Sequence, residues 1–287
     1  MKKNSPQQVK IAIVCNITAG KGKSSAILKR LQEKADHLAI PYFTFTESWP
    51  TSFDGFTFAW LIGGDGTLNH FINQYPDIDI PIALFKGGSG NDFAWKLYGN
   101  KSIDEYFEIV MQGNAHKTDI GICNGRYFIN GVGIGFDGEV VKAMGRKKIL
   151  PGHLGYLSIV LKKIFLYREK EMQIVIDNNS RNERIFMINI ANGSRYGGGF
   201  LIAPQAIVND GALDIVIIKS IAPWKRFFYL PKVETGKHLN LSIADVFKKN
   251  KIKVESAFML PAHLDGELME ANKFEIEIIP AKILFIY

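Results

Sequence analysis

The chain has 287 residues, of which 47% are hydrophobic and 22% are charged. This balance is typical of a folded globular protein and excludes an intrinsically disordered one. The 35 lysines and arginines outnumber the 28 aspartates and glutamates, and the resulting net charge of +7 favours anionic partners such as phosphates or an acidic membrane surface.

The chain is longer than the size at which a single hydrophobic core usually keeps growing, so we expect two domains. The N-terminal sequence MKKNSPQQVK lacks the apolar core of a secretory signal, which predicts a cytoplasmic location. Cys15 and Cys123 are too few for a disulfide framework, and we expect both to be packing residues in a reducing compartment.

The first third of the chain alternates short apolar runs with longer helical patterns, which predicts βαβ units and a parallel sheet. The predicted strands are 10–16, 56–62 and 80–85, and the predicted helices are 23–37, 67–74 and 92–98. Each strand leads into a loop that contains glycine. Such loops are expected to face the one edge at which open α/β sheets bind ligands.

The strongest local signal is the loop Gly63-Gly64-Asp65-Gly66-Thr67, which lies between a strand and a helix. Glycines allow the backbone to approach a phosphate, and a helix N-terminus favours anions. The aspartate would then either hydrogen-bond the loop or engage a magnesium ion that bridges phosphate oxygens. The alternative is an ordinary Asp-Gly turn with the threonine as a helix cap.

Two further loops strengthen the prediction of a phosphate site. One contains Gly88, Ser89, Gly90 and Asn91 before a helix, and the other follows the first strand from Asn16. Two other motif matches are weak: 22–24 resembles the end of a Walker loop without its first glycine, and 133–138 fits a dinucleotide fingerprint without a continuing βαβ pattern.

After about residue 120 the pattern changes to short alternating segments separated by turns, which predicts mostly antiparallel strands. The predicted strands are 126–130, 172–177, 185–189, 213–219 and 251–258, and the predicted helices are 139–144, 154–167 and 225–238. The apolar stretch 149–167, preceded by the basic residues 146–148, is too short and too charged to span a bilayer. It fits either a segment that touches an anionic bilayer or a core helix with a solvated basic flank.

Motifs along almost the whole chain resemble the lipid kinase family that includes soluble bacterial diacylglycerol kinases and the sphingosine and ceramide kinases. The GGDGT run at 63–67 also occurs in NAD kinases and phosphofructokinases, so the later motifs narrow the match. These are GSGNDFA at 88–94, DIG at 119–121, NGVGIGFD at 130–137, YGGGF at 196–200, APQA at 203–206, NDGALD at 209–214 and LDGE at 264–267.

The resemblance implies an α/β N-terminal domain with a three-layer, mostly parallel sheet, followed by a β-rich antiparallel sandwich domain. We expect the nucleotide-binding domain to cover residues 1–120, with 277–287 returning to it, and the lipid-substrate domain to cover 121–276. It also implies a lipid substrate at a membrane surface, with peripheral contact at the inner face of the membrane. A homodimer is a further expectation.

The same resemblance implies ATP over the loops at 63–67 and 88–91, with magnesium near Asp65 and Asp92. Asp265, supported by Glu267, would take the proton from the lipid hydroxyl. On spacing alone, 264–267 fits an Asp-Gly hairpin turn instead. A structural magnesium ion is implied at Asp210, the backbone carbonyls of Ile207 and Ala212, and Asp119; a plain Asp-Gly turn at 210–211 is the alternative.

The chain departs from the family pattern at Ile17, Lys86 and His70, which replace the usual proline, proline and glutamate. The nucleotide preference can therefore differ from that of the family. Two alternatives to a lipid kinase also stay open: an NAD kinase-like enzyme, which shares the GGDGT run, or a nucleotide- or lipid-binding protein without catalysis. Nucleic-acid binding is not expected, because the basic residues are dispersed and no binding motif is present.

Overall fold

The computed structural model describes residues 9–145 and 153–287. The chain divides into two compact units: unit 1 comprises Met1–Lys117 and Ile283–Tyr287, and unit 2 comprises Thr118–Lys282. The sequence predicted a boundary between the two domains near residue 120 and the return of 277–287 to the N-terminal domain. Residues 1–8 and 146–152 lie outside the described residues. The second range contains the basic flank 146–148 and the first residues of the apolar stretch 149–167.

Unit 1 contains a parallel sheet of the strands β1 (Ile11–Cys15), β2 (Tyr42–Phe45), β3 (Phe58–Gly63), β4 (Ile82–Lys86) and the last residues of β13 (Glu267–Ile286). Their order is β13-β4-β3-β1-β2, and every pair is parallel. All five residues of β1 are buried, as expected for a strand covered on both faces.

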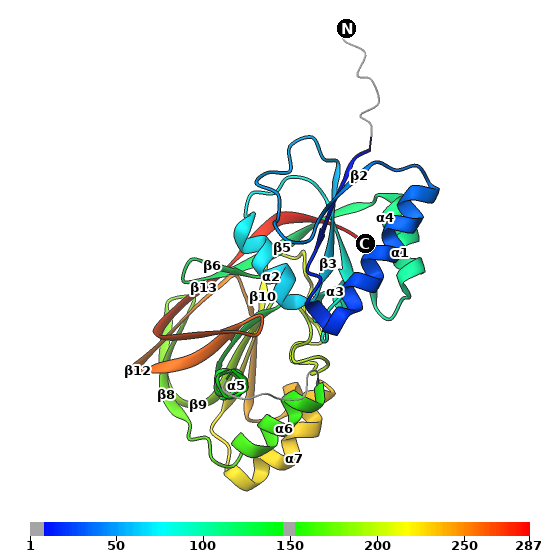
Figure 1. The fold of residues 1–287 in the computed structure, drawn as a ribbon. Helices are drawn as coiled ribbons and strands as arrows, with labels where there is room; N and C mark the ends of the chain where they lie inside the picture. Colours follow the sequence, from blue (N-terminus) through cyan, green and yellow to red (C-terminus); the bar gives the residue numbers. More distant parts are fainter. Residues whose placement is uncertain (1–8, 146–152) are drawn as a thin grey trace. The chain divides into compact units, whose positions relative to one another are not determined.

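Helices cover both faces of this sheet, which gives the predicted three layers (Figure 1). They are α1 (Lys23–His37), α2 (Asp65–Gln74), α3 (Asp92–Tyr98) and α4 (Ile103–Gln112), with a short 3-10 turn at Ala19–Gly22. α1 and α4 lie together, with the ammonium of Lys34 over the ring of Phe107. The ranges predicted for α1 and α3 are confirmed, whereas β2 and α4 were not predicted.

Unit 2 is built from antiparallel strands, which confirms the predicted β-rich half. They are β5 (Ala115–Cys123), β6 (Arg126–Phe128), β7 (Gly131–Gly135), β8 (Lys170–Ile176), β9 (Asn179–Ala191), β10 (Leu213–Lys219), β11 (Ala244–Lys249), β12 (Lys251–Leu264) and β13. The order is β11-β10-β9-β7-β12-β13, and β8 pairs with both β9 and β12. β9 and β12 thus change partners along their length, which bends the strands around a common apolar core.

Three helices of unit 2 enclose a second apolar core on the sheet: α5 (Phe136–Met144), α6 (His153–Lys163) and α7 (Pro223–Glu234), followed by the 3-10 turn Lys237–Asn240. Figure 1 shows α6 and α7 side by side. Cys15 and Cys123 are both buried and neither forms a disulfide, which confirms them as packing residues. Among the described residues no helix is long and apolar enough to cross a bilayer.

The buried side chain of Arg226 joins α7 to the end of α6. Its Nη1 donates to the carbonyls of Ile164 at 2.7 Å and Tyr167 at 2.8 Å, and its Nη2 pairs with Glu169 at 2.6 Å. Burial opposes ionisation of Glu169, but hydrogen bonds from the Ile221 amide and Arg226 outweigh it and hold the pKa of this carboxyl below its ordinary value of 4.5.

We predict that Arg226→Met lowers the free energy of unfolding by about 3–5 kcal/mol at neutral pH, because it leaves Glu169 buried without its partner. The contribution of the ion pair to the free energy of unfolding is complete above pH 4.5 and is lost as the pH falls through the lowered pKa. The difference in stability between the two proteins should therefore shrink in acid, and the part that remains comes from the hydrogen bonds of Arg226 to the carbonyls of Ile164 and Tyr167. Urea unfolding at several pH values measures this. Lys251→Met, at an exposed ion pair with Glu277, is the control; an equal loss there would contradict the prediction.

Candidate active site

The three glycine loops of unit 1 meet backbone to backbone at one edge of the sheet. A Cβ atom on Gly20 would lie 2.2 Å from the carbonyl oxygen of Gly87. One on Gly88 would lie 2.4 Å from the Cα atom of Gly64. Only glycine fits such contacts, so these loops present backbone rather than side chains where they meet.

Polar side chains brace the loops from within. Asn16 donates from Nδ2 to the hydroxyl of Thr67 at 3.1 Å, which links the first loop to the second. Asn91 has a left-handed backbone, and its side chain bonds both the amide and the carbonyl of Gly88 at 2.8 Å. Gly63 has no room for a side chain beside Thr67. These contacts shape the loops, and phosphate binding by them stays a prediction.

The carboxylate of Asp65 accepts the backbone amides of Asp92 and Phe93, each at 3.0 Å. It therefore fixes the start of α3 and ties the second glycine loop to the third. This is the loop-bonding role that the sequence allowed for Asp65. Of the loop residues predicted to bind the nucleotide, Gly66 and Ser89 are exposed and Gly90 is half-buried.

Two of the residues that depart from the family pattern make structural contacts. The ammonium of Lys86 donates to the carbonyl of Gly99 and lies 4.7 Å from the centre of the Tyr106 ring. The exposed ring of His70 lies 5.0 Å from the ring of Trp49. Lys86 thus binds the end of α3, and His70 packs against the segment before β3.

In unit 2, Asp265 and Gly266 form the two-residue turn between β12 and β13, and both have positive φ. The hairpin turn that the sequence allowed at this position is therefore present. The Asp265 carboxylate also accepts the amides of Ile129 at 2.7 Å, Asn130 at 2.8 Å and Gly131 at 2.9 Å. Glu267, directly after the turn, is exposed.

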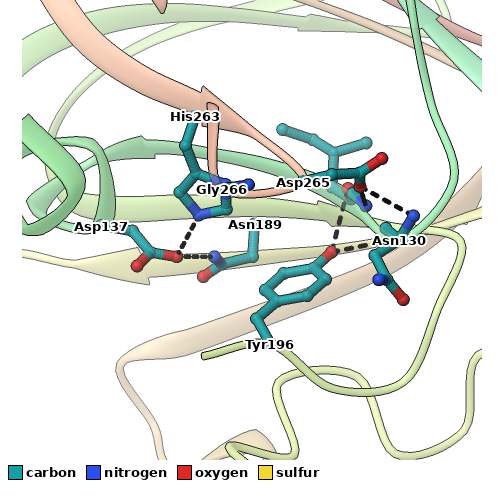
Figure 2. Close-up of polar contacts among 9 residues, drawn as sticks. Asn130, Asp137, Asn189, Tyr196, His263, Asp265 and Gly266 are labelled. Atoms are coloured by element: carbon teal, nitrogen blue, oxygen red, sulfur yellow. Dashed lines mark hydrogen bonds and ion pairs between the residues drawn. The ribbon is translucent and has the colours of Figure 1, made fainter. Parts of the chain in front are cut away.

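A buried polar group beside this turn was missed from the sequence (Figure 2). His263 Nε2 lies 3.0 Å from Oδ2 of Asp137, and Asn189 donates to the same oxygen at 2.9 Å. Burial lowers the pKa of His263, but the negative charges of Asp137 and then Asp265 outweigh it, so the pKa is raised above 6.5. A Cβ atom on Gly133 would lie 2.5 Å from both side chains of the pair.

The glycines of the run 133–138 therefore serve packing rather than dinucleotide binding. Gly133 leaves room for the His263–Asp137 pair, and a Cβ atom on Gly138 would lie 2.1 Å from the carbonyl oxygen of Pro261. α5 can approach β12 only because these side chains are absent. The glycine spacing and the family motif NGVGIGFD at 130–137, which ends at Asp137, were the signals in the sequence that could have drawn attention to this residue.

The aspartates expected to bind a structural magnesium ion make hydrogen bonds or ion pairs with other protein groups. Asp119 accepts the amides of Gly211 and Ala281, both at 2.7 Å. Asp210 accepts the Ala212 amide at 3.1 Å and pairs with the Lys248 ammonium at 2.5 Å.

The other residues expected at this site are Ile207, Ala212 and Asp92. Ile207 is exposed, and Asp92 is buried at the start of α3. Across residues 9–145 and 153–287, no three His, Cys, Asp or Glu side chains are grouped as a metal site. The expected site combines the Asp210 carboxylate with the backbone carbonyls of Ile207 and Ala212, and the metal role of these residues stays a prediction.

An apolar cavity with a volume of about 60 Å³ lies under the helices of unit 2. Its wall is formed by side chains of α5, α6, α7 and the strands beneath them, among them Phe136, Ile164, Phe186 and Leu230. Asp137 belongs to the same wall, so it touches both the cavity and His263.

Comparisons with known proteins agree with this architecture. Residues 10–123 match the model of the diacylglycerol kinase catalytic domain, and residues 130–287 match that of the YegS C-terminal NAD kinase beta sandwich-like domain.

The chain is 29% identical to a Shewanella frigidimarina protein named "Probable lipid kinase YegS-like" over 78% of this chain and 74% of the relative. It is 29% identical to a Bacillus subtilis diacylglycerol kinase over 71% and 69% of the two chains. The crystal structure of a Bacillus anthracis diacylglycerol kinase has the same fold, with a TM-score of 0.74 at 20% identity over 98% of this chain and 97% of that one.

We predict that Gly88→Ala destabilises unit 1 by about 1–3 kcal/mol, because the new methyl group would overlap the backbone of Gly64. Thermal unfolding of the full chain measures the loss. Gly145→Ala is the matched control, since its Cβ atom would meet nothing closer than 4.0 Å. A Gly88→Ala protein as stable as the control would show that the loops do not pack this closely.

Proposed function

This chain belongs to the diacylglycerol kinase family of lipid kinases, and from that membership we propose that it transfers the γ-phosphate of ATP to a hydroxyl group of a lipid. The observation that carries the lipid part of the proposal is the apolar cavity of unit 2. Its wall shares Asp137 with the polar group beside Asp265, so an apolar site and a candidate base belong to one structural group.

On the nucleotide side, the glycine loops of unit 1 supply a surface of backbone next to the starts of α2 and α3. Backbone amides and helix N-termini favour phosphate groups. ATP enters as its magnesium complex, in which the ion neutralises charge on the phosphates. Gly63, Gly64, Gly66, Thr67 and 88–91 are proposed to bind this substrate, with Asp65 holding the loops in place.

On the acceptor side, Asp265 takes the proton of the lipid hydroxyl as its oxygen attacks the γ-phosphorus. The bond between that phosphorus and the β–γ bridging oxygen breaks, and ADP leaves. The three amides at 129–131 fix the plane of the carboxylate before the substrate arrives. Glu267 adds negative charge beside the base.

Access to a lipid requires contact with a membrane, and α7 offers a surface for it. Trp224, Phe227 and Phe228 are 61%, 50% and 66% exposed, and they recur at the spacing of one helix face. The opposite side of α7 lines the apolar cavity. No acidic residue occurs between Lys219 and Val233, so this surface suits the anionic lipids of an inner membrane leaflet.

A direct assay separates this proposal from an NAD kinase and from a protein without catalysis. The chain is incubated with ATP labelled in the γ-phosphate and either NAD or an extract of cellular lipids that includes diacylglycerol. We expect label in the lipid fraction. Label only in NADP, or in neither product, would contradict the proposal.

We predict that Asp265→Asn lowers turnover by about 100-fold or more, the scale expected for loss of a general base, and leaves the affinity for ATP unchanged. Steady-state kinetics and equilibrium ATP binding measure the two effects. Because the amide side chain could also loosen the turn, thermal unfolding accompanies the assay. Unchanged turnover in a folded variant would remove Asp265 from the role of base.

We predict that Trp224→Ala combined with Phe228→Ala weakens binding to vesicles that contain phosphatidylglycerol by about 100-fold or more, since each buried aromatic side chain contributes about 1.5–3 kcal/mol and about 1.4 kcal/mol corresponds to tenfold. Vesicle cosedimentation at several salt concentrations measures it. Phe43→Ala, which removes an equally exposed ring from β2, is the control and should bind as the unaltered chain does. An equal loss in both proteins would argue against the α7 surface.

A further inference from the structure

The ring of His263 contacts the turn that carries Asp265. His263 is buried on β12, and its Nδ1 lies 3.3 Å from the backbone nitrogen of Gly266, the second residue of the turn. A backbone amide can only donate, so Nδ1 is the acceptor and the ring proton is on Nε2. Nε2 then donates to Asp137 at 3.0 Å. The hydrogen bonds thus assign one neutral tautomer to the ring.

Asp137 is itself held in place, so it provides a fixed support. Its Oδ2 also accepts the Nδ2 group of Asn189, and its backbone lies in the first turn of α5, where the helix dipole favours a carboxylate. Hydrogen bonds connect Asn189 on β9 through Asp137 to His263, as Figure 2 shows. The bond from the Gly266 amide to His263 extends this connection to the turn.

The opposite side of the turn is held by the amides at 129–131. Tyr196 connects the two sides, because its hydroxyl donates to the carbonyl of Asn130 at 3.2 Å and its ring lies edge-on to His263 with centres 5.9 Å apart. Gly131 is required for this contact, since a Cβ atom there would lie 1.7 Å from the tyrosine hydroxyl. Asp265 is therefore clamped between two sets of contacts.

From this arrangement we infer that His263, supported by Asp137, is a positioning residue that holds the Asp265–Gly266 turn in its reactive geometry. The inference rests on the proposed function, in which Asp265 is the base. The ring does not contact the substrate in this role. It accepts one amide hydrogen bond, and Asp137 keeps the ring in the tautomer that can do so.

A second proton on the ring would abolish this role. Protonated Nδ1 is a donor and would face the Gly266 amide, which is also a donor, so the hydrogen bond would be lost. The titratable groups that face the ring are Asp137 on α5, Asp265 in the turn and Tyr196. The two carboxylates outweigh burial and raise the pKa of His263 above 6.5. Turnover should therefore fall as the pH decreases through this raised pKa.

Two substitutions separate the two hydrogen bonds of the ring. His263→Asn places an oxygen near the position of Nδ1 and keeps an acceptor for Gly266. His263→Gln places an amide near the position of Nε2 and keeps a donor for Asp137 only. We expect His263→Gln to lower kcat on the order of tenfold with an unchanged KM for ATP, because a misplaced base slows the chemical step. His263→Asn should keep kcat within about threefold and lose the decline at acidic pH.

Lipid phosphorylation is measured against pH for both variants, with Val254→Ala, a buried truncation on the same strand, as the control for lost stability. The control should keep the pH profile of the unaltered chain. Equal kcat values for His263→Gln and His263→Asn, or a retained acidic decline in His263→Asn, would overturn the inference.

An activity-independent measurement keeps the inference separate from the proposed function. Amide hydrogen exchange should show protection of 129–131 and Gly266 in the unaltered chain, and His263→Gln should lose it while His263→Asn retains it. If no lipid is phosphorylated by the unaltered chain, the proposed function fails, and the exchange pattern still tests the clamp. Unchanged protection in His263→Gln would overturn the clamp itself.

Discussion

Hydrogen bonds from backbone amides to aspartate carboxylates hold together each part of this molecule that we connect with function. Asp65 accepts two amides at the start of α3, Asp265 accepts three at the start of β7, and Asp119 accepts those of Gly211 and Ala281. Hydrogen bonds to a charged group contribute about 1.5–3 kcal/mol each, roughly twice as much as neutral ones. The aspartates of the sequence motifs therefore order their loops before any substrate is present.

This explains why two interpretations of the LDGE segment that looked exclusive in the sequence are compatible. Asp265 is the first residue of a two-residue hairpin turn, and its left-handed backbone costs about 1–2 kcal/mol for a residue other than glycine. The three amide bonds to its side chain are individually as large as that cost, so the strained conformation is retained. A carboxylate held in this way cannot swing freely, which would be an advantage in the proposed role of base, because proton transfer requires a defined geometry.

The sequence was most informative where a structural signal is local. The helices at 23–37 and 92–98 follow from apolar spacing and were predicted to the residue. α4 was overlooked although Ser102 and Glu105 form a capping box that can be recognised in a sequence. The contact between His263 and Asp137 could not be predicted in the same way. It depends on the pairing of β12 with β7, which sets His263 opposite Gly133, and this register is a property of the folded sheet.

The apolar character of the cavity wall bears on how a lipid would be selected. The wall of the cavity is almost entirely apolar, and apolar contacts distinguish ligands that differ by one methylene group by only about 10–200-fold. Sites that hydrogen-bond a substrate reject analogues that lack the bonding group by a factor of about 10⁴–10⁵. Asp137, which lines the cavity, contacts His263 beside the turn of Asp265, whereas the lining residues Arg226 and His238 belong to α7 and the 3-10 turn after it. Selection among lipids should therefore depend on the polar end that carries the hydroxyl group, and chain length should matter less.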